Sequence, residues 1–348
     1  MDPIYAAHIQ TSKNAPFFSI VIPVHQCEKT LAKSIESVLQ QDEESYEIIL
    51  VDDGSTDRSG KICDYYANAF PSKIRAIHKK INEGPLFARL DAVEAADGTY
   101  LMFLDADDTY TEGLLRLIKK VIFEFRTDMV IFNHIRVFPD GGTRKYPPKY
   151  ADKTIFEGPG LKQLYADAVI GADLNAVWQK CVRRSLLQNA EDYRKYGNMV
   201  MGEDKLISLE MLSNAKKAIY LSDGLYQYKI TETGLSHAFS IRHYRDLSIV
   251  YRVTLQYGKR WGVADCEKHY YESKVMLGIK CLSSVADQVH KNQKEKSDFK
   301  LLIQEIMKDP EFWQAYDKCR EYIGIKANVV CWLLRHHKVK SVCICFCI

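Results

Sequence analysis

The sequence contains no run of 18 consecutive apolar residues, so it predicts no membrane-spanning helix. Its first 14 residues are polar and lack the apolar core of a secretory signal, and we therefore expect a cytoplasmic chain. The net charge is only +3, which is too small to favour nucleic acid as the main partner. No internal repeat or low-complexity tract occurs, which excludes repeat architectures.

Cysteine is present in quantity, but its setting favours reduced thiols. Ten cysteines are scattered through a chain without an export signal, which argues against a disulfide framework. Hydrophobic residues make up 47% and charged residues 27%, as in soluble globular proteins. A chain of 348 residues can form one unusually large domain, although we expect two.

The most informative stretch is an apolar run that ends in a group of acids. Residues 100–104 are apolar or aromatic without a helical period, which is typical of a strand buried on both faces. Asp105, Asp107 and Asp108 follow directly. Crowded carboxylates repel one another unless a proton or a cation relieves them, and Mg²⁺ or Mn²⁺ shared with substrate phosphates is suited to that. A solvated acidic turn before the next helix is the alternative.

Strand and helix patterns alternate four times in the first part of the chain. Strands are predicted at residues 17–24, 47–51, 73–78 and 100–104, each followed by a helical pattern. This alternation predicts a parallel, doubly wound sheet with right-handed crossovers. Ligands bind beyond the carboxyl ends of such strands, so His25, Asp52, Asp53 and Asp105 should meet in one crevice.

The later pattern changes from mixed to helical. Strands are predicted at 129–134 and 218–221, and helices at 160–169 and from 203 to about 212. After about residue 238 glycine becomes scarce and helix-length periodic segments dominate. We expect an N-terminal extension at 1–15, an α/β domain at 16–237 and a helical C-terminal region with an apolar and basic tail at 238–348.

These motifs together resemble glycosyltransferase family 2, whose enzymes have the GT-A fold. The match extends from residue 18 to about 237 in the right order and spacing. It rests on the segments 19–24, 51–57, 82–89, 96–108, 178–180 and 203–204. The resemblance implies an α/β fold with a doubly wound, mostly parallel sheet and flanking helices.

The resemblance also implies a reaction. An inverting, metal-dependent hexosyltransferase of this family moves a sugar from a nucleotide-sugar, usually a UDP-sugar, to a hydroxyl of a glycan or lipid-linked acceptor, as in cell-surface polysaccharide synthesis. Asp204 matches the general base, and Glu203 would orient the base or the acceptor. Asp107 would bind Mn²⁺ or Mg²⁺ with Asp105 as its partner toward ribose and metal, and His237 would complete that shell; the alternative for His237 is an exposed loop histidine.

Further residues are assigned by the same resemblance. The predicted nucleotide-binding residues are Pro23, His25, Asp52, Asp53, Arg89 and Asp105. A carboxylate is suited to uracil because it accepts the imide N–H. Trp178 and Lys180 are predicted to contact the acceptor or the diphosphate, or else to be a core aromatic and a surface charge. Residues 23–26 and 88–90 depart from the common family pattern, which leaves the nucleobase open.

Two other functions compete with this interpretation. Residues 101–109 also resemble the nucleophile motif of haloacid-dehalogenase-type phosphohydrolases, in which Asp105 would attack phosphorus and Asp107 would act as acid and base. That family places the motif on its first strand, whereas three strand–helix units precede it here. A catalytically silent sugar-nucleotide-binding module would keep the donor residues and lose the base, and the presence of Asp204 argues against it.

The C-terminal tail is basic and apolar. No acid follows Glu321, and the apolar stretches 329–334 and 342–348 alternate with lysine and arginine. Such a composition suits adsorption to an anionic membrane surface, which would place the protein at the inner face of the cell membrane. The alternative is a last helix packed on the core. The sequence specifies neither the donor sugar nor the acceptor.

Overall fold

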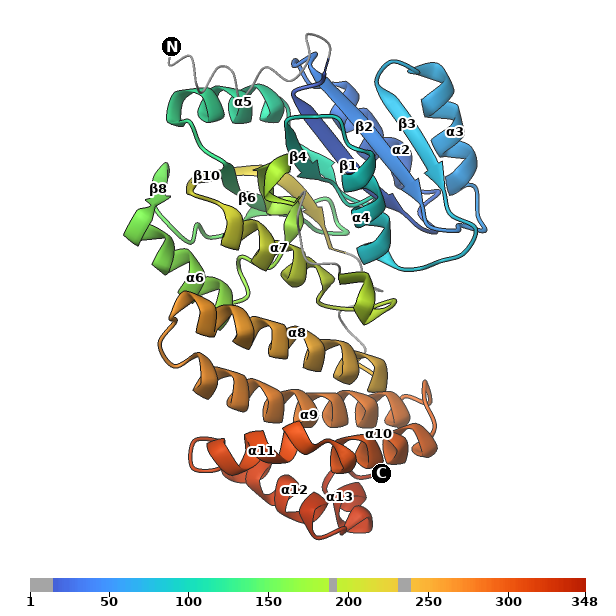
Figure 1. Ribbon diagram of the computed structural model, residues 1–348. Coiled ribbons are helices and arrows are strands. Elements are labelled where there is room, and N and C mark those ends of the chain that lie inside the picture. The colour runs from blue at the N-terminus through green and yellow to red at the C-terminus, as the bar shows by residue number, and fades with distance from the viewer. Residues whose placement is uncertain (1–14, 188–192, 231–238) are drawn as a thin grey trace. The chain divides into compact units, whose positions relative to one another are not determined.

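The computed structural model describes residues 15–187, 193–230 and 239–348 (Figure 1). The chain forms two compact units. The first comprises Met1–Met199 and Glu203–Glu232, and the second comprises Val200–Gly202 and Thr233–Ile348. The first unit is α/β and the second is helical, which confirms the predicted fold class. The predicted domain boundaries at 15/16 and 237/238 stay predictions.

A ten-stranded sheet forms the centre of the first unit. Its strand order is β3-β2-β1-β4-β9-β6-β10-β5, with β7 beside β6 and β8 beside β10. The strands are β1 (Phe18–Val24), β2 (Tyr46–Asp52), β3 (Ile74–His78), β4 (Tyr100–Phe103), β5 (Thr109–Tyr110), β6 (Met129–Val137), β7 (Thr143–Lys145), β8 (Thr154–Glu157), β9 (Lys180–Arg183) and β10 (Lys217–Lys229).

The predicted parallel sheet is present over its first four strands. β1 pairs in parallel with both β2 and β4, and β2 pairs in parallel with β3. Every residue of β2 and β4 is buried, as expected for strands covered on both faces. The carboxyl ends of β1, β2 and β4 therefore lie at one edge of the sheet, where the predicted site residues follow them.

The second half of the sheet is mixed. The four-residue strand β9 lies between β4 and β6 and is antiparallel to both. Its length is too short to show a period in the sequence, and no strand is predicted there. The strand predicted at 218–221 is the start of the longer β10, which runs parallel to β6 with register shifts between 221 and 226. β10 then pairs with β5, so residues 226–229 belong to the sheet.

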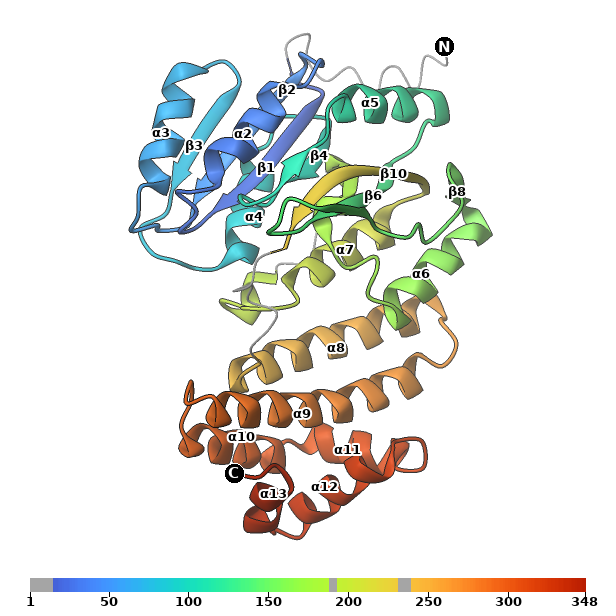
Figure 2. The same ribbon diagram turned by 180° about the vertical axis from the view of Figure 1, so that it is seen from behind.

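Six helices accompany the sheet in the described part of the first unit. They are α2 (Leu31–Leu39), α3 (Ser59–Ala69), α4 (Pro85–Ala95), α5 (Leu114–Phe125), α6 (Leu161–Ile170) and α7 (Glu203–Asn214). Leu31, Ile35 and Val38 are buried at the i, i+4, i+7 spacing that the sequence predicts. The views from front and back show α2 and α4 on opposite faces of the β1–β2 part of the sheet (Figures 1 and 2). This arrangement is a doubly wound sheet.

The second unit is built from helices around its own apolar core. Its helices are α8 (Ile241–Trp261), α9 (Cys266–His290), α10 (Lys296–Lys308), α11 (Pro310–Cys319), α12 (Ile325–Arg335) and α13 (Val339–Cys345). Val342 and Cys343 of α13 are buried in this core. The last helix is therefore packed on the core, which was the alternative to a membrane-bound tail. Within the described residues, no helix has both the length and the apolar character needed to cross a membrane.

Candidate active site

Asp53 follows β2 and fixes the loop that leads into α4. Its side chain is buried, and its two carboxylate oxygens accept hydrogen bonds from the backbone N–H groups of Glu83 (3.0 Å) and Gly84 (2.7 Å). Gly84 has a positive φ of 95°, a conformation that glycine adopts more readily than other residues. Asp53 therefore positions the first turn of α4, the helix that carries Arg89.

The other residues predicted to hold the nucleoside lie beside Asp53. The exposed ring of His25 contacts the Asp53 carbonyl through Nδ1 (3.0 Å) and the Asn82 side-chain amide through Nε2 (2.8 Å). Asp52 is buried, and its carboxylate contacts the Ser55 N–H (3.0 Å) and Nδ1 of His78 (2.9 Å). The structure thus brings His25, Asp52 and Asp53 together at the carboxyl edge, next to Pro23 of β1.

Arg89 joins acids that are distant in the sequence. Its guanidinium lies 2.8 Å from Asp105 Oδ1 through Nη2, and Nη1 lies 3.0 Å from Glu203 Oε1 and 3.0 Å from Asp204 Oδ1. Arg89 is only 4% exposed. Although burial opposes its charge, Asp204, Asp105 and Glu203 raise the pKa of Arg89 above its ordinary value. One buried cation therefore connects the predicted donor-side acid to the predicted catalytic acids.

Asp204 has the environment of a potential base. Burial raises the pKa of Asp204 to about 7; Glu203 and Asp105 act in the same direction, while Arg89 opposes them. The Oδ1 atom is buried and accepts no hydrogen bond within the described part of the chain, and Oδ2 is 3.4 Å from the Val177 N–H. A buried carboxylate with a pKa near neutrality is suited to accept a proton, although Oδ1 also forms the ion pair with Arg89.

Asp105 and Asp107 fit a hard divalent cation. Burial and the neighbouring Asp105 raise the pKa of Asp107, which reflects negative charge that the protein compensates poorly. No group of three or more His, Cys, Asp or Glu side chains that could hold a metal ion occurs among the described residues. Two carboxylates nevertheless suit Mg²⁺ or Mn²⁺, because these ions commonly complete their shell with water and substrate phosphate oxygens.

Asp108 supports the site from inside the sheet. Its carboxylate accepts hydrogen bonds from the Tyr226 hydroxyl (2.8 Å) and the Lys229 N–H (2.7 Å). Burial, with Asp105 and Asp107, raises the pKa of Asp108 to about 8. The Tyr226 hydroxyl also accepts from the Asp105 N–H (3.2 Å). Asp108 and Tyr226 thereby attach β10 to the loop that follows β4.

A cavity of about 410 Å³ lies beside Asp204. Trp178 of the short helix η2 (Val177–Gln179) lines it, and its ring stacks on Tyr226 (centroids 4.5 Å apart) and on Tyr228 (5.6 Å apart). His134 of β6 also lines the cavity and meets Trp178 edge-on at 5.1 Å. The cavity thus joins a potential base to an aromatic wall.

Lys180 does not line this cavity. Its side chain is fully buried, and Nζ donates to the Leu174 carbonyl (2.8 Å), to the Ala176 carbonyl and to Ser208 Oγ (3.1 Å). Burial lowers the pKa of Lys180 to about 7, and Asp204 opposes that change. In the structure Lys180 holds the loop before η2 against α7; its contact with acceptor or diphosphate stays a prediction. His237 lies outside the described residues.

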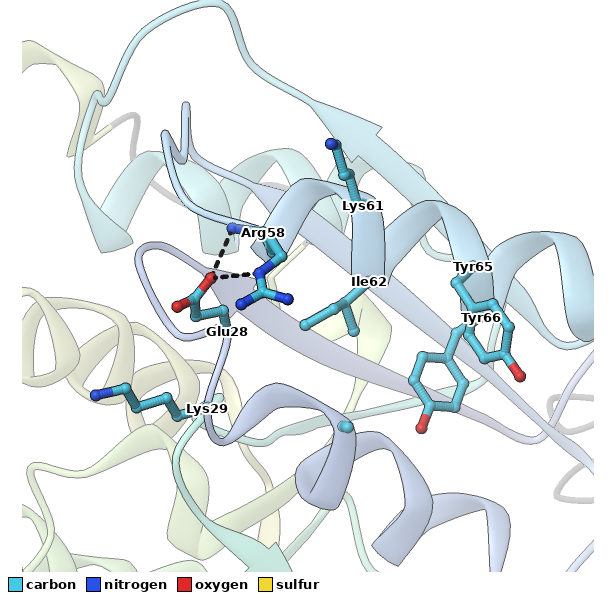
Figure 3. A pocket seen from close by; sticks show the side chains of 8 residues that line it. Glu28, Lys29, Arg58, Lys61, Ile62, Tyr65 and Tyr66 are labelled. Atoms are coloured by element: carbon cyan, nitrogen blue, oxygen red, sulfur yellow. Dashed lines mark hydrogen bonds and ion pairs between the residues drawn. The ribbon is translucent and has the colours of Figure 1, made fainter.

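A second cavity, of about 550 Å³, lies between the start of α2 and α3 (Figure 3). Figure 3 shows Glu28 joined to Arg58, whose Nε lies 3.4 Å from the Glu28 carboxylate and whose backbone N–H donates to the same oxygen. None of the described residues that line this cavity is a predicted site residue. The cavity beside Asp204 is therefore the one associated with the predicted chemistry.

Sequence reasoning missed the wall of the cavity formed by β6. Asn133 and His134 are buried polar residues in the middle of this strand, 4% and 6% exposed. They come directly after the apolar residues Met129 to Phe132, as Asp52 and Asp105 come after their strands. Two polar residues that follow an apolar run within a strand are the local signal that could have found them. The pairing of Arg89 with Glu203 and Asp204 joins residues 114 and 115 positions apart and leaves no local signal.

The family model and two relatives that match this chain are described as glycosyltransferases. Residues 19–183 match the family described as "Glycosyl transferase family 2". The uncharacterized glycosyltransferase EpsJ of Bacillus subtilis is 30% identical over 226 residues, which are 64% of this chain and 63% of EpsJ. Glycosyltransferase GlyA of Streptococcus pneumoniae is 27% identical over 231 residues, which are 64% of this chain and 32% of GlyA. Each match spans less than two thirds of the relative's own length.

Solved structures show the same fold. The crystal structure of S. aureus TarS 1–349 in complex with UDP-GlcNAc aligns with a TM-score of 0.64 and 19% identity, over 93% of this chain and 89% of that chain. A second TarS structure, in complex with UDP, aligns with a TM-score of 0.62. At this level of identity the likeness establishes the GT-A type of architecture and carries no residue roles.

Proposed function

Because this chain belongs to glycosyltransferase family 2, we propose that it moves a sugar from a nucleotide-sugar, a UDP-sugar, to a hydroxyl group of a glycan or lipid-linked acceptor. The observation that carries the proposal is the position of Arg89, which joins the donor-side acid Asp105 to Glu203 and Asp204. The complex of TarS with UDP-GlcNAc supports a UDP-hexose as the donor.

Asp204 is the base in the proposed reaction. Its carboxylate, in the wall of the cavity, takes the proton of the acceptor hydroxyl while the hydroxyl oxygen attacks the anomeric carbon. The bond from that carbon to the diphosphate oxygen breaks on the opposite side, so the configuration at the anomeric carbon is inverted. A pKa of about 7 suits proton transfer near neutral pH. Glu203, on the same guanidinium, orients the base or the acceptor.

The donor side uses the carboxyl edge of the sheet. His25 and Asp53, with Pro23 and Asp52, form the site for the nucleoside, and Asp105 contacts ribose. Mg²⁺ or Mn²⁺ bound by Asp107 and Asp105 would supply positive charge for the leaving diphosphate. The guanidinium of Arg89 holds Asp105 in place and limits repulsion between the carboxylates.

The acceptor belongs to cell-surface polysaccharide synthesis in this proposal. The minor teichoic acid biosynthesis protein GgaA of Bacillus subtilis is 40% identical over 106 residues, which are 29% of this chain and 24% of GgaA. The aromatic wall around Trp178 offers flat apolar faces of the kind on which sugar rings pack. The cavity beside Asp204 is therefore the proposed acceptor site.

Replacement of the base tests this function. With UDP-GlcNAc as donor probe, Asp204→Asn should lower sugar transfer at least 100-fold and leave UDP affinity within threefold. Asp97→Asn, an exposed acid paired with Arg75, is the matched control and should keep full activity. Full transfer by Asp204→Asn would remove this residue from the mechanism. Phosphate monoesters, assayed beside the UDP-sugar, separate this function from a phosphohydrolase.

We further propose that the second unit lies against an anionic membrane surface. Ile325, Val329 and Trp332 are exposed at the i, i+4, i+7 spacing, so they form one apolar face of α12. Lys338, which precedes α13, and Lys340, in its first turn, are exposed as well. Apolar side chains beside lysines are suited to the interface of anionic lipids, and such a contact would bring the enzyme to a lipid-linked acceptor.

A further inference from the structure

Arg136 is a cation at the cavity wall without an acidic partner. Its guanidinium lies over the ring of Tyr146, 4.7 Å from the centroid, and both residues line the cavity that contains Asp204. In the part of the chain that the structure describes, no carboxylate lies within ion-pair distance of Arg136. Lys149, another cation in the wall, is by contrast paired with Asp167 and Asp173.

A second unpaired arginine lies next to Arg136. In the antiparallel ladder of β6 and β7, Arg136 is directly opposite Arg144, and Arg144 likewise has no ion pair among the described residues. Side chains at such opposed positions start about 5 Å apart, and like charges there destabilise the pairing. An anion bound between the two guanidinium groups would remove this repulsion.

One residue of the cavity wall also has a buried polar atom without a hydrogen-bond partner. His134 is 6% exposed, and its Nδ1 makes no hydrogen bond within the described residues. Its ring stacks on Tyr146 with centroids 4.6 Å apart. Burial, with a contribution from Arg136, lowers the pKa of His134 to about 4, so the imidazole is neutral near pH 7. An unsatisfied neutral ring nitrogen in a cavity fits a ligand hydroxyl.

A series of ring contacts runs from the donor side along the cavity wall toward Arg136. Tyr226 contacts Asp105, and Trp178, His134 and Tyr146 follow in sequence with centroid distances of 4.5, 5.1 and 4.6 Å. Arg136 lies beyond the last ring. The donor diphosphate belongs beside Asp105 and Asp107, whereas Arg136 lines the cavity that is the proposed acceptor site, so we assign a group that reaches Arg136 to the acceptor.

We propose that the acceptor carries a negative charge, as a phosphate or a carboxylate, and that Arg136 binds this group with Arg144 beside it while His134 holds an acceptor hydroxyl. This inference rests on the proposed function and names the chemical class of its acceptor. The planar guanidinium of Arg136, stacked on Tyr146, leaves its N–H edge available for a bidentate contact with two anionic oxygens.

Binding of three oligosaccharides with equal numbers of sugar rings tests the proposal: one with phosphodiester links, one with uronate residues and one neutral. Calorimetric titrations into full-length protein saturated with UDP keep phosphate groups out of the donor site. We expect at least tenfold tighter binding of a charged oligosaccharide than of the neutral one, because hydrogen bonds to charged groups are stronger than those between neutral groups. The preferred probe shows whether the charge is a phosphate or a carboxylate.

Variants assign this preference to residues. Arg136→Gln should reduce the preference to within threefold, and Arg144→Gln should reduce it partly. Arg116→Gln, an exposed arginine paired with Asp42 on another part of the unit, should bind as the wild type does. His134→Phe keeps a ring but removes Nδ1. It should weaken the binding of charged and neutral oligosaccharides equally, by about tenfold.

Several results would overturn the inference. They are equal binding of charged and neutral oligosaccharides by the wild type, binding of none of the three, and a preference that survives both Arg136→Gln and Arg144→Gln. Failure of the proposed function gives a different result, since the wild type would then neither bind UDP nor transfer sugar from UDP-GlcNAc. Both quantities are measured on the same preparation.

Discussion

At the scale of single residues, Arg89 has the most demanding position in the candidate site. One guanidinium faces three carboxylates in a setting where it is 4% exposed. If all three acids are ionised, the group keeps a net charge of about −2, and this surplus adds to burial, the larger cause, in raising the pKa of Asp204. The surplus can be removed by a proton on Asp204 or by a cation near Asp105. Arg89 therefore couples the state of the base to the donor side.

Removal of this cation should be costly. Arg89→Met is expected to lower the free energy of unfolding by about 3–5 kcal/mol, because it leaves buried carboxylates without a counter-charge. Urea denaturation at pH 7 measures the effect. Arg116→Met removes an arginine whose ion pair with Asp42 is largely exposed, and it should cost less than about 1 kcal/mol. Equal effects of the two substitutions would contradict the role given to Arg89.

His134 should make stability depend on pH in a defined window. Its pKa in the folded state is about 4, below the usual value near 6.5. Between these values the unfolded chain binds a proton that the folded protein does not, so stability is present above pH 6.5 and is lost as the pH falls toward 4. The loss attributable to this residue is about 2–3 kcal/mol.

The measurement compares unfolding of the wild type and His134→Phe from pH 7 to pH 4.5. The difference in stability between the two should change across this range in favour of the variant. Other acids, including Asp204 in the same cavity, titrate in both proteins and cancel in the difference. Parallel curves would show that His134 is not held neutral by its surroundings.

At the scale of elements, the junction between β2 and α4 positions the guanidinium. Asp53 at the end of β2 binds the N–H groups of Glu83 and Gly84, and α4 starts at Pro85 and carries Arg89 one turn later. Proline is favoured in the first turn because its missing N–H would have no partner there. The connection from β2 to Arg89 is therefore short and is fixed by hydrogen bonds.

Gly84→Ala should destabilise the protein by more than the cost of placing alanine at a positive φ. A Cβ at position 84 would overlap Asn198 Oδ1, and φ is +95°. Gly141 has a similar φ of +83° but no atom within 4 Å of an added Cβ, so Gly141→Ala isolates the conformational cost. We expect about 1 kcal/mol for Gly141→Ala and about 2–4 kcal/mol for Gly84→Ala by urea denaturation, with reduced UDP affinity only in Gly84→Ala. Equal costs would mean that the overlap relaxes freely.

The sequence predicted elements better where the pattern was long and local. The four parallel strands and the helices between them follow from apolar runs and amphipathic spacing, and the strand-end argument located His25, Asp52, Asp53 and Asp105. Strand β9 was missed because four residues show no period, and its place between β4 and β6 is set by tertiary pairing. The roles of the site residues remain predictions, because the geometry places them without testing their chemistry.

At the scale of the whole molecule, the matched family segment and the candidate site have different limits. The match covers residues 19–183 and includes Arg89, Asp105 and Trp178. Glu203 and Asp204 begin α7 beyond it, and Tyr226 lies in the last strand of the first unit. The site is complete only when α7 and β10 are added to the matched segment. Donor-side features thus have family support, whereas the acceptor wall must be argued from this chain's own residues.

The second unit gives a prediction about membrane contact that does not require truncation. Deletion of residues 336–348 would remove Val342 and Cys343 from the core of this unit, so single charges on the exposed face of α12 are a better test. Trp332→Glu should lower co-sedimentation with vesicles that contain phosphatidylglycerol at least tenfold, since it places a carboxylate where an apolar ring meets the lipid.

The control is an apolar residue with the same exposure on another helix. Met276 of α9 is 47% exposed, close to the 51% of Trp332, and Met276→Glu should leave vesicle binding unchanged. Binding should weaken as salt rises and should be much weaker with phosphatidylcholine alone, because lysines such as Lys338 and Lys340 contribute only against anionic lipid. Equal loss in both variants would point to general charge repulsion, and absence of binding by the wild type would remove the membrane from the proposed function while leaving the chemistry of the first unit untouched.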